Sequence, residues 1–314
     1  MCYSAQIEAE YRKYQRLYDA RIDVEAFVAL YWNRLQDARI KIPLALDLAF
    51  TTPETEWEHG IRVLIDQFKA QQTQRLEQEL FKQRKRLADA ERTLQTRTTK
   101  AALESRRIAT AKTEWILGKL ADLRRTTLQD ADARIYPGHY APVLVVEGGE
   151  RVIKPMRYQC RPAGKPPGYD TQYPGTYNAR RDNLQGFWKE QFGYTHGIMV
   201  VNAFYEHVDV AVPGGCGETE NRVLEFKPQP QQDMLVACLW SRWTAHGEPE
   251  LYSFAAITDE PPPEVAAAGL DRCIIPIKPE HMDAWLNPEP GNLAALYAIL
   301  DDREQPYYEH RMAA

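Results

Sequence analysis

The chain has 314 residues, of which 44% are hydrophobic and 26% charged, and its formal net charge is −5. This composition can bury one large core or two smaller ones. No run of 18 apolar residues occurs, which excludes a membrane-spanning helix, and charged residues between Glu8 and Lys13 interrupt any signal-peptide pattern, so we expect a cytoplasmic protein. The five cysteines are widely spaced without a CxxC pair, so the sequence indicates no zinc site, other metal, cofactor or disulfide framework.

The first half of the chain predicts two helical segments. Residues 23–36 place apolar side chains on one helical face behind Asp23, a favourable N-cap. A longer tract runs from about Pro53 to Arg125 and contains no further proline. Its apolar residues recur every seventh position, at Leu80, Leu87, Leu94, Ala101, Ile108 and Trp115. Since the partner positions are often polar, the tract predicts a long helix or a helical hairpin rather than a true coiled coil.

The long tract is basic. Between Lys82 and Arg125 there are 13 Lys and Arg residues against 5 Asp and Glu residues, a surplus of eight, so the rest of the chain carries −13. A solvated helix face explains this pattern most simply. The functional alternative is an electrostatic binding surface for nucleic acid.

After about Ile135 the pattern changes from helix to strand. Two β-branched runs flank Gly148 and Gly149, which predicts a hairpin. Residues 158–185 are rich in Pro, Gly and Tyr and predict a loop. The remaining predicted strands span 196–208, 233–243, 250–258 and 272–278, and the short helices span 279–287 and 292–302. Strands grouped apart from helices predict an α+β fold.

Five unusual pieces occur in a fixed order. They are Cys behind the initiator Met, YPGHYAPVLVV, YNARRDNL, FYEH at the end of an apolar strand, and DRCIIPI followed by PEHMDAWL. In this combination the chain resembles the SRAP family, the SOS response-associated peptidases that shield abasic sites. The resemblance covers residues 1–6 and about 134–290. It implies an antiparallel, β-rich, barrel-like core of residues 1–9 and 131–314 with flanking helices, and a helical insertion at 10–130 whose basic tract spans about 54–126.

The resemblance also implies an enzyme of DNA-damage repair that acts at the nucleoid. Family members bind single-stranded DNA carrying an abasic site and join it through the N-terminal Cys, here Cys2, and removal of Met1 is the minimal peptidase activity. The chemistry suits Cys2, because a 1,2-aminothiol condenses with the aldehyde of an abasic site to an imine, which the thiol closes to a thiazolidine. An α-amine with a reference pKa of about 7.7–8.0 is partly neutral at physiological pH.

The remaining roles follow from matching positions. Asn178 matches the family residue that holds the α-amine, and Glu206 matches the catalytic carboxylate that transfers protons. A turn-forming Asn and a structural ion pair are the respective alternatives. Arg180 matches a DNA-phosphate contact. Weaker DNA-binding candidates, for which core or surface roles compete, are Arg181, Arg157, Arg161, Lys165, Trp188 and Tyr205.

Two positions depart from the family pattern. Ser4 stands where the family often has an Arg. Leu270 occupies the position of a family His, and a leucine cannot transfer a proton. The nearby His281 and the more distant His196, His207 and His246 are substitutes among which the spacing does not choose.

Two other functions compete with this interpretation. In an N-terminal-nucleophile amidohydrolase, Cys2 would attack a carboxamide with its own amine as base, and glutamine hydrolysis would support that function. A non-catalytic nucleic-acid-binding protein built on the basic tract would instead show salt-sensitive DNA binding that survives loss of Cys2.

Overall fold

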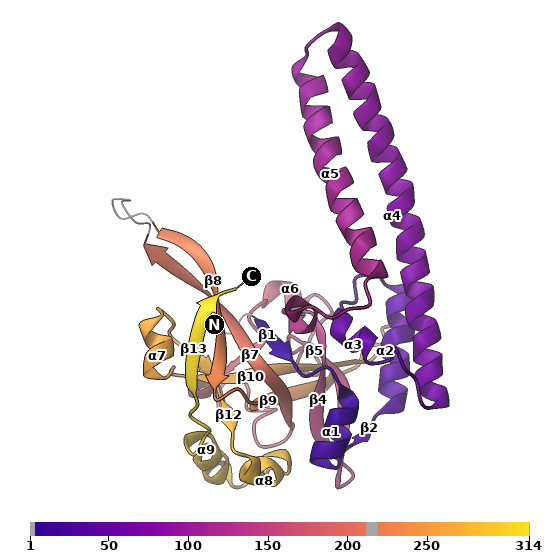
Figure 1. Cartoon of the computed structure of the whole chain (residues 1–314). Coiled ribbons are helices and arrows are strands. Elements are labelled where there is room, and N and C mark those ends of the chain that lie inside the picture. The colour runs from indigo at the N-terminus through magenta and orange to yellow at the C-terminus, as the bar shows by residue number, and fades with distance from the viewer. Residues whose placement is uncertain (1–3, 212–218, 314) are drawn as a thin grey trace. The chain divides into compact units, whose positions relative to one another are not determined.

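The computed structural model describes residues 4–211 and 219–313 (Figure 1). Two compact units are present, one formed by Met1–Thr52 with Gln129–Ala314 and the other by Pro53–Leu128. The first unit contains the sheet and its flanking helices, and the second is a helical hairpin. The bounds of the hairpin unit nearly coincide with those of the expected basic tract, 54–126, while residues 10–52 belong to the same unit as the sheet. That residues 10–130 form an insertion relative to other family members stays a prediction.

The sheet contains both short and long strands, and neighbouring strands are often far apart in the sequence. The strands are β1 (Ser4–Ile7), β2 (Arg21–Ile22), β3 (Arg134–Ile135), β4 (Tyr140–Glu147), β5 (Glu150–Tyr158), β6 (Asn178–Arg180), β7 (His196–Ala211), β8 (Thr219–Gln229), β9 (Met234–Trp243), β10 (Leu251–Asp259), β11 (Cys273–Ile274), β12 (Pro276–Ile277) and β13 (Tyr307–Met312). The α-helices are α1 (Tyr11–Tyr18), α2 (Val24–Gln36), α3 (Leu44–Leu48), α4 (Glu56–Thr96), α5 (Lys100–Arg124), α6 (Tyr169–Gln172), α7 (Pro263–Ala267), α8 (Met282–Leu286) and α9 (Leu293–Asp301). Within the described residues, none of the helices is sufficiently long and apolar to span a membrane.

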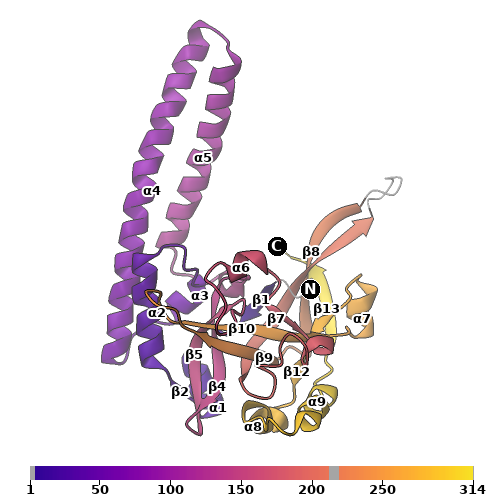
Figure 2. The same cartoon turned by 180° about the vertical axis from the view of Figure 1, so that it is seen from behind.

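Five strands close a ring in the order β9, β10, β5, β4, β7 and back to β9. All neighbours in this ring are antiparallel except β10 and β5, which are parallel, so the ring is not a regular barrel. Figure 2 shows this ring from behind, with α8 and α9 together beside β12. The predicted α+β class, with a mostly antiparallel sheet and a long helical insertion, is confirmed.

Most of the predicted strands and helices are present. Gly148 and Gly149 adopt positive φ angles of 60° and 82° and connect β4 to β5, as the hairpin pattern requires. The prediction that 158–185 is only loop is wrong, because β6 lies within it and pairs in parallel with β10. A three-residue strand is too short to show periodicity. The predicted strand at 272–278 is divided into β11 and β12, which pair with different neighbours.

The second unit is an antiparallel hairpin of α4 and α5 (Figure 1). Thr55 and Glu58 form a capping box at the start of α4, and the Thr99 side chain caps α5. Leu80, Ile116 and Leu120 form the buried seam with Leu76. The sequence correctly placed Leu80 in this seam. The seven-residue repeat also predicted Trp115 as a seam residue, which is wrong, since Trp115 is 60% exposed. The break between the two helices restarts the helical phase, so that Ile116 faces inward instead.

One seam position is polar. Gln83 on α4 is buried and donates through Nε2 to Glu79 Oε1 at 2.7 Å, but its Oε1 has no partner within the described residues. An unsatisfied buried carbonyl costs about 1–3 kcal/mol. Gln83 therefore weakens the hairpin relative to an apolar residue of similar size.

We expect Gln83→Leu to raise the hairpin's free energy of unfolding by about 1 kcal/mol, because it removes this cost and adds apolar contact. Urea unfolding followed by circular dichroism at 222 nm measures the change. The matched control is Gln78→Leu at an exposed position of the same helix, which should give no comparable gain. Equal effects of the two substitutions would show that the seam position is not special.

Candidate functional site

Asn178 is held in the interior by β6. The side chain is only 8% exposed, and the Thr258 hydroxyl on β10 donates to Asn178 Oδ1. The parallel pairing of Asn178 with Ala256 and of Arg180 with Thr258 sets this contact. The amide nitrogen Nδ2 is buried and has no hydrogen-bond partner in the part of the chain that the structure describes. Thr258 therefore orients the Oδ1 end of the amide, and the Nδ2 end is available for a further hydrogen bond.

Glu206 is a buried carboxylate on β7, with 2% of the residue exposed. It lies close enough to Cys273 on β11 for its charge, second to burial, to raise the pKa of that thiol. Cys273 pairs with Asp259 on β10, and the next residue, Ile274, pairs with Thr258. Glu206 therefore lies within electrostatic range of β11, and Asn178 contacts β10, the strand with which β11 pairs. Burial of a carboxylate is costly, so its position here needs a task or a partner.

The first described strand of the chain, β1, pairs with β7 directly beside Glu206. Ser4 on β1 is buried and lies opposite Tyr205, the neighbour of Glu206 on β7. Cys2 and its predicted role lie outside the described residues.

Arg134 contacts Ser4, the residue at which the resemblance leads us to expect an Arg. Its Nε donates to Ser4 Oγ at 2.9 Å, and its guanidinium lies 3.8 Å from the centre of the Tyr205 ring. Sequence reasoning missed this residue because Arg134 is 130 positions from Ser4, and only the pairing of β1 with β3 and β7 brings them together.

Leu270 is buried in the turn between α7 and β11, and it precedes Cys273 by three residues. The position at which the resemblance leads us to expect a His is therefore a buried leucine.

Three of the four candidate substitutes for this His have other partners. His196 is buried, with Nδ1 3.0 Å from the Trp285 carbonyl and Nε2 accepting the Gly193 N–H at 2.8 Å. Burial lowers the pKa of His196 to about 3, so it is a neutral structural residue at physiological pH. His281 Nε2 lies 2.8 Å from the Asp302 carboxylate. His207 follows Glu206 but points to the opposite face of the strand, where it contacts Asn221.

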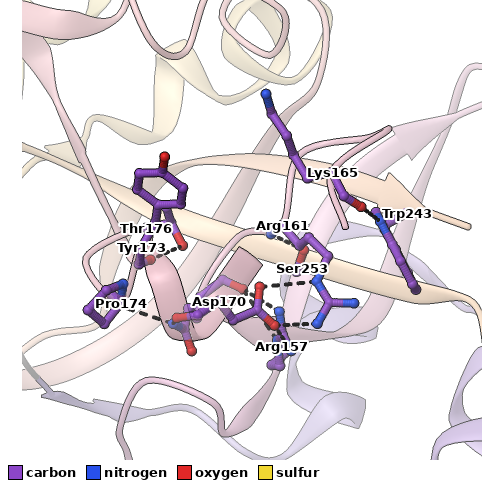
Figure 3. A network of polar contacts seen from close by, with 10 residues as sticks. Arg157, Arg161, Lys165, Asp170, Tyr173, Pro174, Thr176, Trp243 and Ser253 are labelled. Atoms are coloured by element: carbon purple, nitrogen blue, oxygen red, sulfur yellow. Dashed lines mark hydrogen bonds and ion pairs between the residues drawn. The ribbon is translucent and has the colours of Figure 1, made fainter. Parts of the chain in front are cut away.

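Two of the expected DNA-binding arginines form an internal ion-pair network (Figure 3). Arg157 and Arg161 both contact the carboxylate of Asp170 on α6, Arg157 at 2.8 Å. The Arg161 guanidinium also lies 4.4 Å from the centre of the Trp243 ring. Burial acts to raise the pKa of Asp170, but the two arginines lower it below its ordinary value. This network fixes the segment that leads into β6 and Asn178.

The other expected DNA contacts differ in exposure. Arg180 follows Asn178 by two residues, is half-exposed and pairs only with Asp182 among the described residues. Arg181 contacts Asp301 and lies 3.7 Å from Asp259. Trp188 is 3% exposed and packs edge-on against Phe187, which favours core packing over base stacking. Arg180 is therefore the arginine of this group best placed for a phosphate.

We expect Asp170→Asn to destabilise the protein by about 3 kcal/mol, because it leaves two largely buried guanidinium groups without their shared carboxylate. Urea unfolding followed by tryptophan fluorescence measures the loss. Asp182→Asn is the matched control, since it breaks a solvent-exposed pair with Arg180 and should change stability little. If Asp170→Asn also has little effect, Arg157 and Arg161 are free for another role.

Comparison with known proteins gives the family. Residues 91–312 match the family model described as SOS response associated peptidase (SRAP). Among solved structures, a Bordetella bronchiseptica protein is 18% identical over 58% of this chain and 87% of its own, with a TM-score of 0.45. A Bacteroides thetaiotaomicron protein is 12% identical over 62% and 82%, with a TM-score of 0.47. A phage-related protein of B. bronchiseptica is 16% identical over 57% and 80%, with a TM-score of 0.44. No curated protein matches the chain. Because the family model covers more than half of the sequence, the chain belongs to the SRAP family.

Proposed function

We propose that this protein binds single-stranded DNA at abasic sites and links to it covalently through Cys2. The proposal is supported by the burial of two polar residues at the matching family positions, Asn178 bonded to Thr258 on β10 and Glu206 within electrostatic range of Cys273 on the neighbouring β11. Ser4, two positions after Cys2 in the sequence, pairs with Tyr205, the neighbour of Glu206. Family membership adds the DNA-damage context.

The chemistry divides among these groups. After removal of Met1, the neutral α-amine of Cys2 adds to the aldehyde carbon and water leaves to give an imine. The thiol sulfur then adds to the imine carbon, and its proton passes to the nitrogen as the thiazolidine closes. Glu206 would carry protons to and from the leaving oxygen, as a positioned carboxylate can. The closed ring removes the aldehyde and so prevents strand cleavage by β-elimination.

Asn178 would orient the amine. The Thr258 hydroxyl can donate or accept, so the amide of Asn178 can present either Nδ2 or Oδ1 to the amine while keeping its bond to Thr258. Presenting Oδ1 would hold an amine N–H and leave the nitrogen lone pair free to attack. A neutral amide does this without stabilising the unreactive ammonium as a carboxylate would.

DNA phosphates would be bound at the rim of the site. Arg180 is exposed immediately beyond Asn178, and Arg134 reaches Ser4, where it would supply the guanidinium that position four lacks. A planar guanidinium binds two phosphate oxygens at once.

We expect the purified protein to lack Met1 and to form a denaturation-resistant adduct with a single-stranded oligonucleotide that carries one abasic site. Intact mass and denaturing electrophoresis detect the adduct. Cys2→Ala should abolish it, because neither imine trapping nor ring closure is then available, whereas Cys160→Ala at a buried thiol should keep it. The aminothiol mechanism is wrong if protein with an uncleaved N-terminal tag crosslinks equally well.

We expect Leu270→His to accelerate adduct formation or release by at least about tenfold, the low end of the contribution of a positioned acid–base group. Exchange of a preformed adduct onto excess competitor abasic DNA measures release. Leu270→Asn is the control, because it introduces a polar group of similar cost without a titrating proton. Unchanged rates for Leu270→His, with a rapid wild type, would mean that another residue has taken the role.

A further inference from the structure

The distal half of the hairpin carries a basic groove that the proposed reaction does not use. The groove has a volume of about 610 Å³ and lies between α4 and α5. Four cations line it, Lys82, Lys85, Arg86 and Arg97, against the single carboxylate of Asp89. From Lys82 to Arg97 the helical rise spans about 22 Å. Small residues at Ala90, Ala101 and Ala102 create the hollow.

The positive charge of this groove is only partly compensated: outside the lining, Glu79 lies near Lys82, and Glu104, which pairs with Arg107, lies in the field of Arg86. Asp89 is engaged 3.0 Å away by Arg92, which does not line the groove. Arg86 donates to the neutral Ser105 Oγ across the seam, and Lys82 is 72% exposed with its nearest carboxylate 3.9 Å away. Lys85 and Arg97 form no ion pair within the described residues. Repulsion among these cations favours binding of a polyanion.

The lining also distinguishes between classes of polyanion. A protein partner would be expected to find an aromatic or large aliphatic anchor point, and a membrane surface an apolar insertion face. The apolar lining of this groove consists of alanines alone, while exposed Phe81 and Trp115 lie outside it. A row of cations without an apolar anchor fits a regular chain of phosphates.

We infer that this groove binds the phosphate backbone of single-stranded DNA, independently of base sequence and of any abasic lesion. The inference does not depend on the covalent chemistry proposed above, since an undamaged strand presents the same phosphates.

The test uses the full chain and a fluorescent 30-nucleotide single strand without a lesion. Fluorescence anisotropy gives the dissociation constant between 50 and 300 mM salt. The groove variant combines Lys82→Gln, Lys85→Gln, Arg86→Gln and Arg97→Gln. The matched control combines Arg75→Gln, Arg84→Gln, Arg106→Gln and Lys112→Gln, which removes the same charge from exposed positions outside the groove.

Four lost phosphate contacts, at about 0.7 each for a single strand, should make the slope of log affinity against log salt shallower by about 2–3. The groove variant should also bind at least about tenfold more weakly at 50 mM salt, and the control should change affinity much less. Equal losses in both variants, or no loss in the groove variant, would overturn the inference. At saturating abasic DNA the groove variant should still form adduct if the proposed function holds, so the two proposals fail separately.

Discussion

The fold depends on the backbone hydrogen bonds of one long strand. β7 has 16 residues, and successive parts of it pair with β9 and β4, then β1, then β8. Because buried N–H and C=O groups must be satisfied, each change of partner fixes the point at which another strand enters or leaves the sheet. The pairing with β9 ends at Val201, the pairing with β8 begins at Phe204, and the pairing with β1 ends at Tyr205, the neighbour of Glu206. The long strand that closes the ring thus also brings the described N-terminal strand beside the buried carboxylate.

Stability and function make opposite demands at this point. An amide with one buried end unsatisfied costs folding free energy, and an apolar side chain of similar size would remove the cost. The surroundings offset it through rigid support: Thr258 orients Asn178, the Arg157–Asp170–Arg161 network fixes the approach to β6, and Arg134 stacks on Tyr205. Retention of costly groups within a well-braced frame is the pattern expected of a preorganised site.

The sequence predicted those elements whose formation depends on a local pattern of residues. The Gly148–Gly149 turn, the apolar strands β9 and β10, and the Asp23-capped helix α2 each carry their own periodicity or cap, and all three are present. It missed β8, whose sequence TENRVLEFKPQ is polar at one end, and β6, which exists only because β10 offers it a partner. For the site, motif order predicted Asn178 and Glu206. No local pattern reveals that Arg161 lies against Trp243 while Arg180 is exposed, because both depend on the path of the intervening loop.

The central claim is that the buried Glu206 transfers protons during adduct formation, and the substitution Glu206→Gln tests it most directly. Glutamine keeps the shape and hydrogen-bonding capacity but cannot carry the proton. With folding verified by thermal melting, the account predicts that the initial rate of adduct formation on abasic single-stranded DNA falls by at least about 100-fold in the variant. It also predicts that the variant stays folded, with a melting temperature close to that of the wild type. A variant that reacts at the wild-type rate but melts at a lower temperature would contradict the account and make Glu206 a structural residue.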